Sequence, residues 1–487
     1  MILDRLPVRL GAAALLGGVG VFAFAPFGLF WLAPLACLGF FLLLGRAANV
    51  KAAFLTGWAF GAGFFLLGVS WIYVSLSVFG GMPPWLAGFA TVLFCVSLGL
   101  FPALAAAVFK RWQPAGQVRQ AIFFAALLAL ADWVRGWAFT GFPWLALGYS
   151  QVPPSPLAGF APIVGVHGLG LLVAAGGALL AVWRVGLPVL AVLAAAGFGL
   201  RQVAWTEPVG EPVSVALVQG NIPQEMKFRP EHFVSTLLTY RDLVARNPAR
   251  LTVLPETAFP AFLEQVPQEY LAEMKALARR QGGDLVFGAA TGDRQYWNSA
   301  ATLGTAPMQV YSKSHLVPFG EFIPPGFAWF MAMASIPMSD FSRGPLEQAP
   351  FAVAGQRVAP NICYEDAFGE EIIRSLPAAT LLVNMSNTAW FGRSLAQPQH
   401  LQISQLRALE TGRPMLRATN TGMTAVVAPD GTVQAVLPPF VAGVLRTEVR
   451  GYQGLTPYAR FGNWPAVSLA FLLVLVAARR VPGRRRR

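Results

Sequence analysis

The chain has 487 residues, of which 55% are hydrophobic and only 12% are charged, and its mean hydropathy is +0.54. This composition is typical of a polytopic membrane protein with room for one soluble domain, and it argues against a wholly soluble chain. The net charge of +13 does not indicate nucleic-acid binding, because residues 206–462 carry a net charge of −1 and the basic excess belongs to residues 1–205 and 463–487.

Apolar runs that could cross a membrane recur through the first 205 residues and once more near the C-terminus. They lie at 8–24, 28–45, 52–74, 85–109, 119–134, 158–183, 187–201 and 464–478. Residues 52–109 contain no charged side chain, and this length suffices for two crossings and their connection. We therefore expect about eight transmembrane helices, seven in a membrane domain at 1–205 and the eighth at 463–487 together with a basic tail.

Basic residues are distributed unequally between the two sides that this arrangement defines. Fourteen lie on the side of the two termini, and only Arg135 and Arg201 lie on the other. The fourteen are the six tail arginines with Arg5, Arg9, Arg46, Lys51, Lys110, Arg111, Arg119 and Arg184. Because cytoplasmic loops carry such an excess, we expect both termini to be cytoplasmic and the domain at 206–462 to be extracytoplasmic.

Residues 206–462 have the pattern of a soluble α/β domain. Short β-branched runs such as "VSVALVQG", "DLVFGAA" and "ATLLVNMSN" alternate with amphipathic stretches such as "QEYLAEMKALARR". Strands buried on both faces and separated by helices indicate sheets that are covered by helices. The apolar tract "PPGFAWFMAMASIPM" at 324–338 is too short and too rich in proline to span a membrane, so it is either a core loop or a membrane-dipping lid.

Cys363 is the one cysteine outside a predicted membrane segment. Cys37 and Cys95 lie within apolar runs, where a cysteine packs as a small apolar group. Because its own domain holds no second cysteine, Cys363 is either an inert buried thiol or a reactive one. It ends the strand-like run "RVAPNIC" and precedes the helical pattern "YEDAFGEEIIR". Such a strand-to-helix elbow presents a nucleophile and places backbone N–H groups beside it.

A reactive thiol needs a base and an electrophilic partner. Glu256 follows a strand-like run in "LTVLPETAFP", and Lys313 follows another in "VYSKSHLVPFGEFIP". Taken alone, a charged residue after a strand is usually solvated, so neither position is diagnostic. Among the four histidines, His315 and His400 lie in motif-like surroundings, which leaves a Cys–His pair open.

In the order Glu256, Lys313, Cys363, these residues resemble the Glu–Lys–Cys triad of the nitrilase superfamily, whose fold is an α-β-β-α sandwich. With the flanking apolar runs, essentially the whole chain resembles the apolipoprotein N-acyltransferase family. The segments that carry the resemblance include "GVSWIYVSL", "RGWAFTGFPWLALGYSQ", "VQGNIPQEMKF", "LPETAFP", "YSKSHLVPFGEFIP", "NICYEDAF", "NMSNTAWFG" and "LRATNTGMTAVVAPDG".

The resemblance implies a role for each site residue. Glu256 is expected to be the general base, Lys313 to stabilise the oxyanion, and Cys363 to be the nucleophile. Supporting positions are Glu321, Tyr364 and Glu365. Residues expected to form a lid or to contact substrate are Phe228, Phe327, Trp329 and Phe330. Phe228 stands where close relatives have tryptophan, so a function that needs an indole N–H is not expected here.

The resemblance also implies the substrates and the compartment. The expected donor is a membrane phospholipid, phosphatidylethanolamine through its sn-1 chain, and the expected acceptor is the α-amine of the N-terminal diacylglyceryl-cysteine of an apolipoprotein. The expected location is the bacterial inner membrane, with the catalytic domain in the periplasm. No metal-ligand or nucleotide-binding pattern occurs in the sequence, so no metal or other cofactor is expected.

Two other functions fit part of the pattern. A membrane-anchored amidohydrolase would use the same three residues and discharge the thioester with water, but it would need only one anchoring span. A transporter or scaffold with an inert extracytoplasmic domain would place charged pairs within its spans, where Asp132 with Arg135 is the only candidate.

Overall fold

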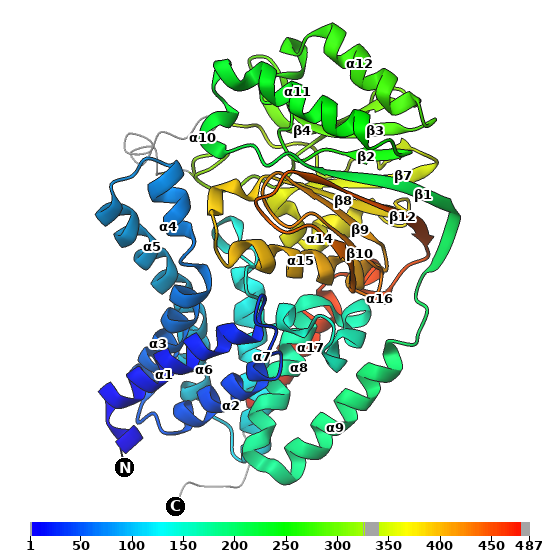
Figure 1. Cartoon of the computed structure of the whole chain (residues 1–487). Coiled ribbons are helices and arrows are strands. Elements are labelled where there is room, and N and C mark those ends of the chain that lie inside the picture. The colour runs from blue at the N-terminus through cyan, green and yellow to red at the C-terminus, as the bar shows by residue number, and fades with distance from the viewer. Residues whose placement is uncertain (1, 325, 327–339, 479–487) are drawn as a thin grey trace, which may run out of the picture. The chain divides into compact units, whose positions relative to one another are not determined.

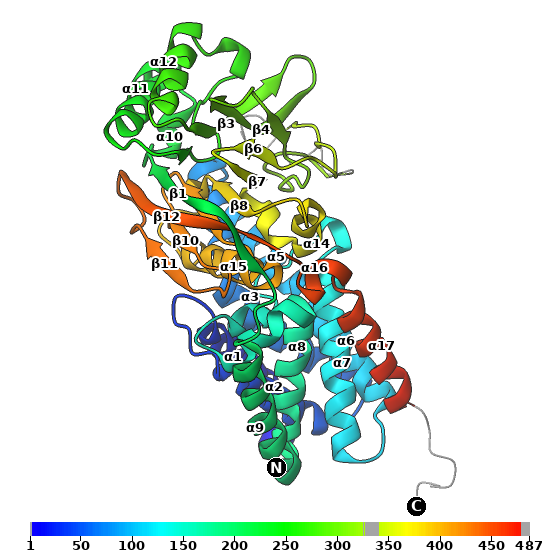
Figure 2. The same cartoon turned by 90° about the vertical axis from the view of Figure 1, so that its right-hand side faces the viewer.

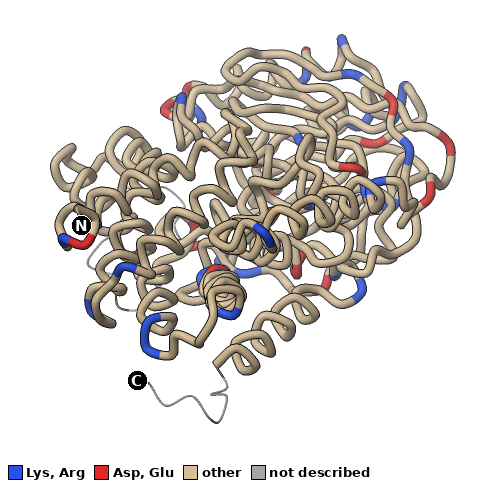
Figure 3. The backbone as a smooth tube through the Cα atoms, turned by 90° about the horizontal axis from the view of Figure 1, so that it is seen from below, with Lys and Arg blue, Asp and Glu red and all other residues tan. Residues whose placement is uncertain are grey.

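The computed structural model describes residues 2–324, 326 and 340–478 (Figure 1). The chain divides into two compact units. The first unit contains Met1–Ser70, Gly88–Val203 and the segment from Phe461 onward, and the second contains Trp71–Ala87 and Ala204–Arg460. Charged residues occupy a small part of the backbone in Figure 3, in keeping with the 12% charged composition.

The first unit is built from apolar helices. Its helices are α1 (Leu6–Gly20), α2 (Leu32–Gly45), α3 (Val50–Val69), α5 (Pro84–Leu98), α6 (Leu100–Trp112), α7 (Gln117–Arg135), α8 (Ala161–Leu179), α9 (Trp183–Leu200) and α17 (Trp464–Ala478). Among the described residues, five helical stretches are long and apolar enough to cross a membrane, and α2 and α17 are shorter apolar helices. Helix α7 packs against α8 and α17, and these helices lie side by side in Figure 2.

Two glycines set the approach of α1 to α3. A Cβ atom on Gly17 would lie 2.0 Å from the carbonyl oxygen of Phe60, and one on Gly63 would lie 2.0 Å from the carbonyl oxygen of Ala14. The two backbones therefore touch at positions where any larger residue would collide. Small residues at such crossings are typical of helix packing in membranes, where close van der Waals contact replaces the hydrophobic effect.

The charged pair Asp132–Arg135 in the first unit is engaged in local backbone contacts. Arg135 forms an ion pair with Asp132 and donates hydrogen bonds to the carbonyl oxygens of Phe142 and, at 2.8 Å, Trp144. Asp132 accepts a hydrogen bond of 3.0 Å from the backbone N–H of Leu147. The pair thereby fixes the loop that follows α7. This is a structural use, and it gives no support to the transporter alternative.

The second unit contains, within the described residues, two six-stranded sheets. The first has the order β12-β1-β2-β3-β4-β5, and the second has the order β11-β10-β9-β8-β7-β6. The strands are β1 (Glu207–Gln219), β2 (Leu251–Val253), β3 (Asp284–Gly292), β4 (Tyr296–Gly304), β5 (Val310–Ser312), β6 (Phe351–Val353), β7 (Gln356–Ile362), β8 (Leu381–Ser386), β9 (Met415–Thr419), β10 (Ala425–Val427), β11 (Val433–Val436) and β12 (Gly443–Gln453). In each sheet, three central parallel strands are flanked by antiparallel ones.

Helices cover the outer face of each sheet (Figure 1). Helices α11 (Pro230–Arg246) and α12 (Gln268–Arg279) lie on the first sheet, while α14 (Gly369–Ile372) and α15 (Ala396–Thr411) lie on the second. The short helices α10 (Gln224–Lys227) and α16 (Pro457–Phe461) lie at the ends of connecting segments. The predicted α-β-β-α sandwich is therefore confirmed in this unit.

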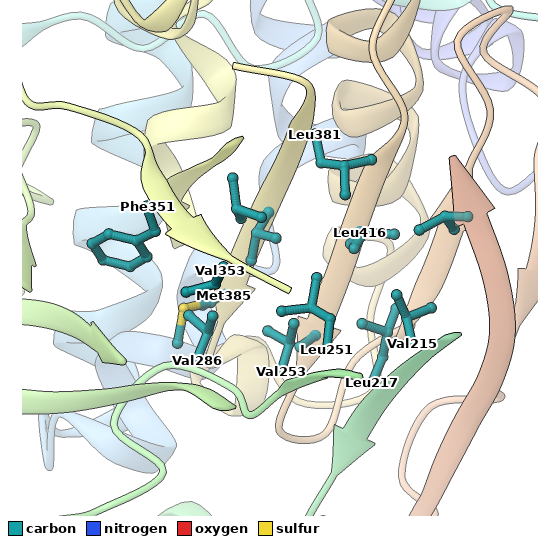
Figure 4. Close-up of a cluster of buried hydrophobic side chains, with 14 of the residues drawn as sticks. Val215, Leu217, Leu251, Val253, Val286, Phe351, Val353, Leu381, Met385 and Leu416 are labelled. Atoms are coloured by element: carbon teal, nitrogen blue, oxygen red, sulfur yellow. The ribbon is translucent and has the colours of Figure 1, made fainter. Parts of the chain in front are cut away.

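The inner faces of the two sheets meet in an apolar core (Figure 4). Leu217, Leu251 and Val286 reach it from the first sheet, and Leu381 and Leu416 reach it from the second. All five side chains are fully buried, at 0% exposure. Burial on both faces explains why these strands are continuous β-branched and leucine runs in the sequence rather than alternating ones.

The apolar run predicted at 52–74 is divided between the units. Helix α3 ends at Val69, and the following segment Trp71–Ala87, which contains α4 (Ile72–Val74), packs within the second unit. There the Ser75 hydroxyl donates to the carbonyl oxygen of Trp390 at 2.8 Å, and Trp71 packs against Phe391. The apolar composition of residues 52–74 did not predict this division, because the same apolar residues pack against lipid and against a protein core.

Leu416→Ala should destabilise the sandwich by about 2–5 kcal/mol, because it leaves a cavity between the two sheets. The expected result is a fall in Tm of roughly 5–15 °C, measured on the purified protein in detergent. Leu455→Ala is the matched control, because Leu455 is 38% exposed and its loss should change Tm by only about 1–2 °C. Equal shifts for the two variants would contradict a core at this position.

Candidate active site

The three predicted catalytic residues each follow a strand of the second unit. Glu256 lies shortly after β2, Lys313 directly after β5, and Cys363 directly after β7. Strands β2 and β5 belong to the first sheet and β7 belongs to the second. The site therefore depends on the packing of one sheet on the other.

Both carboxylate oxygens of Glu256 are engaged. Oε1 accepts a hydrogen bond of 2.8 Å from Nδ2 of Asn298 on β4, and Oε2 accepts one of 2.8 Å from the backbone N–H of Asn387. The ammonium of Lys313 lies 3.6 Å from Oε1. Only 8% of Glu256 is exposed, so these contacts replace most of its hydration and hold its orientation.

Lys313 is held by a second carboxylate. Its Nζ lies 2.9 Å from Oε1 and 2.8 Å from Oε2 of Glu321. Glu321 also accepts hydrogen bonds from Asn298 and from the backbone N–H of Val317. Burial works to lower the pKa of Lys313, but Glu321 and Glu256 outweigh it and raise that pKa above its ordinary value. The Lys313 ammonium therefore stays protonated and positively charged at neutral pH.

Cys363 occupies the predicted elbow. Strand β7 ends at Ile362, a 3₁₀ helix spans Cys363–Ala367, and Cys363 itself has φ of +54°. That conformation costs a side-chain-bearing residue about 1–3 kcal/mol, and it persists only where neighbours enforce it. Here the carbonyl oxygen of Cys363 lies 3.0 Å from Nδ2 of Asn384 and 3.2 Å from Nε2 of His400. The elbow prediction is confirmed, although the helix that follows is only one short turn.

The Cys363 thiol is protonated at rest. Burial and the charge of Glu256 raise its pKa above the ordinary value for a thiol, and the opposing effect of Lys313 does not restore it. Lys313 therefore favours the thiolate, but its charge is outweighed by burial and by Glu256. Attack by sulfur consequently requires the thiol to give up its proton to a base within the site.

Glu365 ties the lysine strand to the nucleophile elbow. Its carboxylate accepts hydrogen bonds from the backbone N–H groups of Ser314 at 2.7 Å, His315 at 3.1 Å and Ile362 at 2.7 Å. It also accepts one of 3.0 Å from the hydroxyl of Tyr311. Since Ser314 follows Lys313 and Ile362 precedes Cys363, this one carboxylate joins the two segments that carry the predicted catalytic groups.

The other predicted residues divide into those placed and those not described. The ring of Tyr364 packs against His315 and Phe368, with centroid distances of 5.8 and 5.0 Å, so its side chain is a packing element. Phe228 is half-buried and directly follows α10. The predicted lid residues Phe327, Trp329 and Phe330 lie outside the described residues.

The hydrogen bonds described for His315 and His400 are made with groups other than the Cys363 thiol. Nε2 of His400 lies 2.8 Å from Oδ1 of Asp366 in addition to its contact with the Cys363 carbonyl oxygen. Burial and the charge of Arg417 lower the pKa of His400, so the imidazole is neutral. His400 thus supports the backbone of the elbow, and Glu256 is the better candidate for the base.

Sequence reasoning did not single out Asn298 or Asn387, although both bind Glu256. Asn387 lies in the segment "NMSNTAWFG", which carries part of the family resemblance, so a signal existed for it. Asn298 lies within the apolar strand β4, and a lone amide in a buried strand was the only available sign. The contacts cross from one strand to another, which spacing along the chain does not reveal.

Comparison with known proteins bears on both halves of the chain. Residues 16–179 match the model of the apolipoprotein N-acyltransferase N-terminal domain, and residues 214–457 match that of the carbon-nitrogen hydrolases. The apolipoprotein N-acyltransferase of Nitrosomonas europaea is 51% identical over 491 residues, covering 96% of this chain and 97% of that protein. The chain belongs to the apolipoprotein N-acyltransferase family.

Other members of the apolipoprotein N-acyltransferase family give the same result. The enzyme of Ralstonia nicotianae is 48% identical, covering 98% of this chain and 94% of that protein. Among solved structures, an amidase of the nitrilase superfamily from Nesterenkonia is 21% identical, covers 52% of this chain and 95% of its own, and has a TM-score of 0.38. The predicted family, and with it the prediction of an acyltransferase, is confirmed by the full-length relatives.

Gly288→Ala should lower N-acyltransferase activity at least about tenfold, because it displaces the loop that carries Glu256. A Cβ atom at Gly288 would lie 2.4 Å from the backbone nitrogen of Thr257 and 2.8 Å from Cα of Glu256. Gly443→Ala is the control, because its Cβ would meet only Leu437 at an ordinary 3.6 Å. Activity is compared after both variants pass a Tm check, and undiminished activity of folded Gly288→Ala would refute the close-approach argument.

Lys313→Met should slow alkylation of Cys363 by iodoacetamide, because Lys313 is the charge that lowers the pKa of this thiol. At pH 8 the expected slowing is at least about tenfold, equivalent to one pKa unit. The rate is followed by mass spectrometry of the peptide that contains Cys363. Lys275→Met, a partly exposed lysine on α12, is the control and should leave the rate unchanged. Faster alkylation in Lys313→Met would show that Lys313 does not act on the thiol electrostatically.

Proposed function

We propose that this chain transfers a fatty acyl group from a membrane phospholipid, through a thioester on Cys363, to the α-amine of the N-terminal diacylglyceryl-cysteine of apolipoproteins. The observation that carries the proposal is the convergence of Glu256, Lys313 and Cys363 in one buried site of a family member. A base, a fixed positive charge and a thiol are the groups that acyl transfer through a covalent intermediate requires.

In the first step, the sulfur of Cys363 forms a bond to the ester carbonyl carbon of the donor. Glu256 accepts the thiol proton as this bond forms, which the protonated resting state of Cys363 makes necessary. Negative charge then gathers on the carbonyl oxygen, and Lys313 with the backbone N–H of Tyr364 stabilises it. When the tetrahedral intermediate collapses, the C–O bond breaks and Glu256 returns the proton to the departing lyso-lipid oxygen.

In the second step, the acceptor amine attacks the thioester carbonyl carbon. Glu256 removes a proton from the attacking amine, the C–S bond breaks, and the thiol of Cys363 regains a proton. The acyl group passes from an ester to a more stable amide, so no energy-supplying cosubstrate is needed. A thiol suits the intermediate position because it attacks esters when ionised and departs readily when an amine attacks.

Glu321 acts through Lys313 in this scheme. Its carboxylate holds the ammonium within 2.9 Å, and its bond to Asn298 connects it to the same amide that orients Glu256. Glu365 holds the two strand ends that carry Lys313 and Cys363. These hydrogen bonds keep the charged groups in place, so that they need not reorganise when the transition state forms.

We further propose eight membrane crossings, with both termini in the cytoplasm and the catalytic domain at 206–462 in the periplasm of a bacterial inner membrane. The unequal distribution of basic residues supports this arrangement. So do two contacts within the helical unit: Arg9 donates to the carbonyl oxygen of Arg46 at 3.1 Å, and Arg119 donates to that of Ala477 at 3.0 Å. These place helix ends that we assign to the cytoplasm beside one another.

The proposed domain boundaries follow from this arrangement. Residues 1–205 form the membrane domain with seven crossings, except that Trp71–Ala87 packs within the second unit; residues 206–462 form the rest of the catalytic domain, and residues 463–487 form the eighth crossing and its tail. A site at the outer surface of the bilayer would admit both lipid substrates from the side. Phosphatidylethanolamine is the proposed donor, and Phe228 is the described residue proposed to contact an acyl chain.

The test is intact-mass analysis of the purified protein after incubation with phosphatidylethanolamine and no acceptor. We expect an acyl adduct on Cys363 that hydroxylamine removes, that is absent from Cys363→Ala, and that disappears when a diacylated lipopeptide is added. Glu256→Gln should keep Tm within a few degrees of wild type and reduce adduct formation at least about a hundredfold.

Two outcomes would contradict the proposal. An adduct discharged as fast by water as by the lipopeptide would identify an amidohydrolase instead. Acceptor acylation without any adduct on Cys363, in a preparation of proven activity, would exclude the thioester route.

A further inference from the structure

A second buried lysine borders the site and has no assigned role. Lys227 is the last residue of α10, and only 1% of it is exposed. Its ammonium donates a hydrogen bond of 3.0 Å to the backbone carbonyl oxygen of Glu256. Among contacts with the described residues, this is the one hydrogen bond that the Lys227 ammonium donates. A lysine is almost never fully buried without a charged partner, so its surroundings require explanation.

The segment that carries Lys227 is fixed to the same loops as the base. Gln224, the first residue of α10, accepts a hydrogen bond of 2.8 Å from Nδ2 of Asn387, whose backbone N–H binds Glu256. Asn420 holds Ile222 through both of its backbone polar groups, at 2.9 and 2.8 Å. The position of the Lys227 ammonium is therefore determined by the active site rather than by solvent.

Lys227 adds a second positive charge to a site that is rich in buried carboxylates. The carboxylates of Glu256 and Glu321 face the ammonium of Lys313, and the buried carboxylate of Glu365 also interacts with it, so negative groups outnumber this one ammonium. Lys227 offsets part of this negative charge. Both Glu256 and Cys363 interact with it electrostatically, because each acts to raise the Lys227 pKa.

This second positive charge matters during the first chemical step. When the proton of Cys363 passes to Glu256, the negative charge moves from the carboxylate to sulfur and then to the substrate oxygen. An uncompensated negative charge nearby opposes that movement, whereas a second ammonium favours it.

We propose that Lys227 is a positioning residue that holds the backbone of Glu256 and offsets negative charge beside Glu256 and Cys363, so that negative charge can pass from Glu256 to Cys363. This inference rests on the proposed function. Lys227 acts through Glu256 and need not touch substrate, which distinguishes it from Lys313.

The charge of Lys227 should be lost in a measurable pH range. Burial lowers its pKa to about 8, against the opposing effects of Glu256 and Cys363. Lys313, the neighbouring ammonium, has a raised pKa and stays charged over the same range. Lys227 is therefore protonated below about pH 8 and neutral above it, and the rate of Cys363 acylation should fall as pH rises through this value.

The experiment measures the initial rate of Cys363 acylation by phosphatidylethanolamine from pH 6 to 10, using intact mass and no acceptor. Lys227→Gln keeps an N–H donor for the Glu256 carbonyl but removes the charge. We expect it to acylate at least about tenfold more slowly than wild type at pH 7, the equivalent of one pKa unit, and to lack the alkaline decline. Lys227→Arg, which keeps the charge from pH 6 to 10, should exceed Lys227→Gln in rate and should also lack the alkaline decline.

Lys275→Gln is the matched control and should follow the wild-type profile. A Lys227→Gln rate within twofold of wild type, with the same alkaline decline, would overturn the charge-offsetting role. A wild-type rate that stays constant or rises from pH 7 to 9.5 would overturn it as well, without reference to any variant. Failure of the wild type to form an adduct would instead count against the proposed thioester route.

Discussion

The buried ion pair between Lys313 and Glu321 constrains the arrangement of the second unit, the catalytic unit, which holds the candidate active site. Taking two charges out of water costs several kcal/mol for each ion, and their mutual attraction offsets this only when further hydrogen bonds complete the geometry. Here Asn298 and the backbone N–H of Val317 supply those bonds to Glu321. Such a cluster is weak evidence for stability, and its value lies in holding a positive charge 3.6 Å from the carboxylate of Glu256.

The candidate site is assembled from residues of both sheets. The first sheet brings Glu256, Asn298 and Lys313 together from β2, β4 and β5. The second sheet delivers Cys363 at the end of β7, and Glu365 fastens the two sheets at that edge. The apolar core between the sheets consequently contributes to the placement of the candidate site residues as well as to the stability of the fold.

Much of this was predictable from the sequence. Continuous apolar runs indicated buried strands, and the order Glu256, Lys313, Cys363, with the surrounding segments, indicated the family. The contacts of Asn298 and Lys227 were not predictable, because they join segments that are distant in the chain and leave no periodic signal. The raised thiol pKa was also missed, since the cost of burying a thiolate depends on packing that the sequence does not specify. The roles of the individual site residues and the exact number of membrane crossings stay predictions.

The catalytic unit is assembled from two separate stretches of chain, Trp71–Ala87 and Ala204–Arg460. Trp71 and Phe79 pack against Phe391 and Trp390, in the turn that closely follows Asn387 and its bond to Glu256. A fragment that began at Ala204 would therefore lack part of its own packing and would expose two large aromatic rings next to the segment that binds Glu256. The second unit is therefore not an independent domain made of one continuous stretch of chain. The chain emerging from the first helices is itself a structural component of the unit, and it is synthesised long before the strands that it must support.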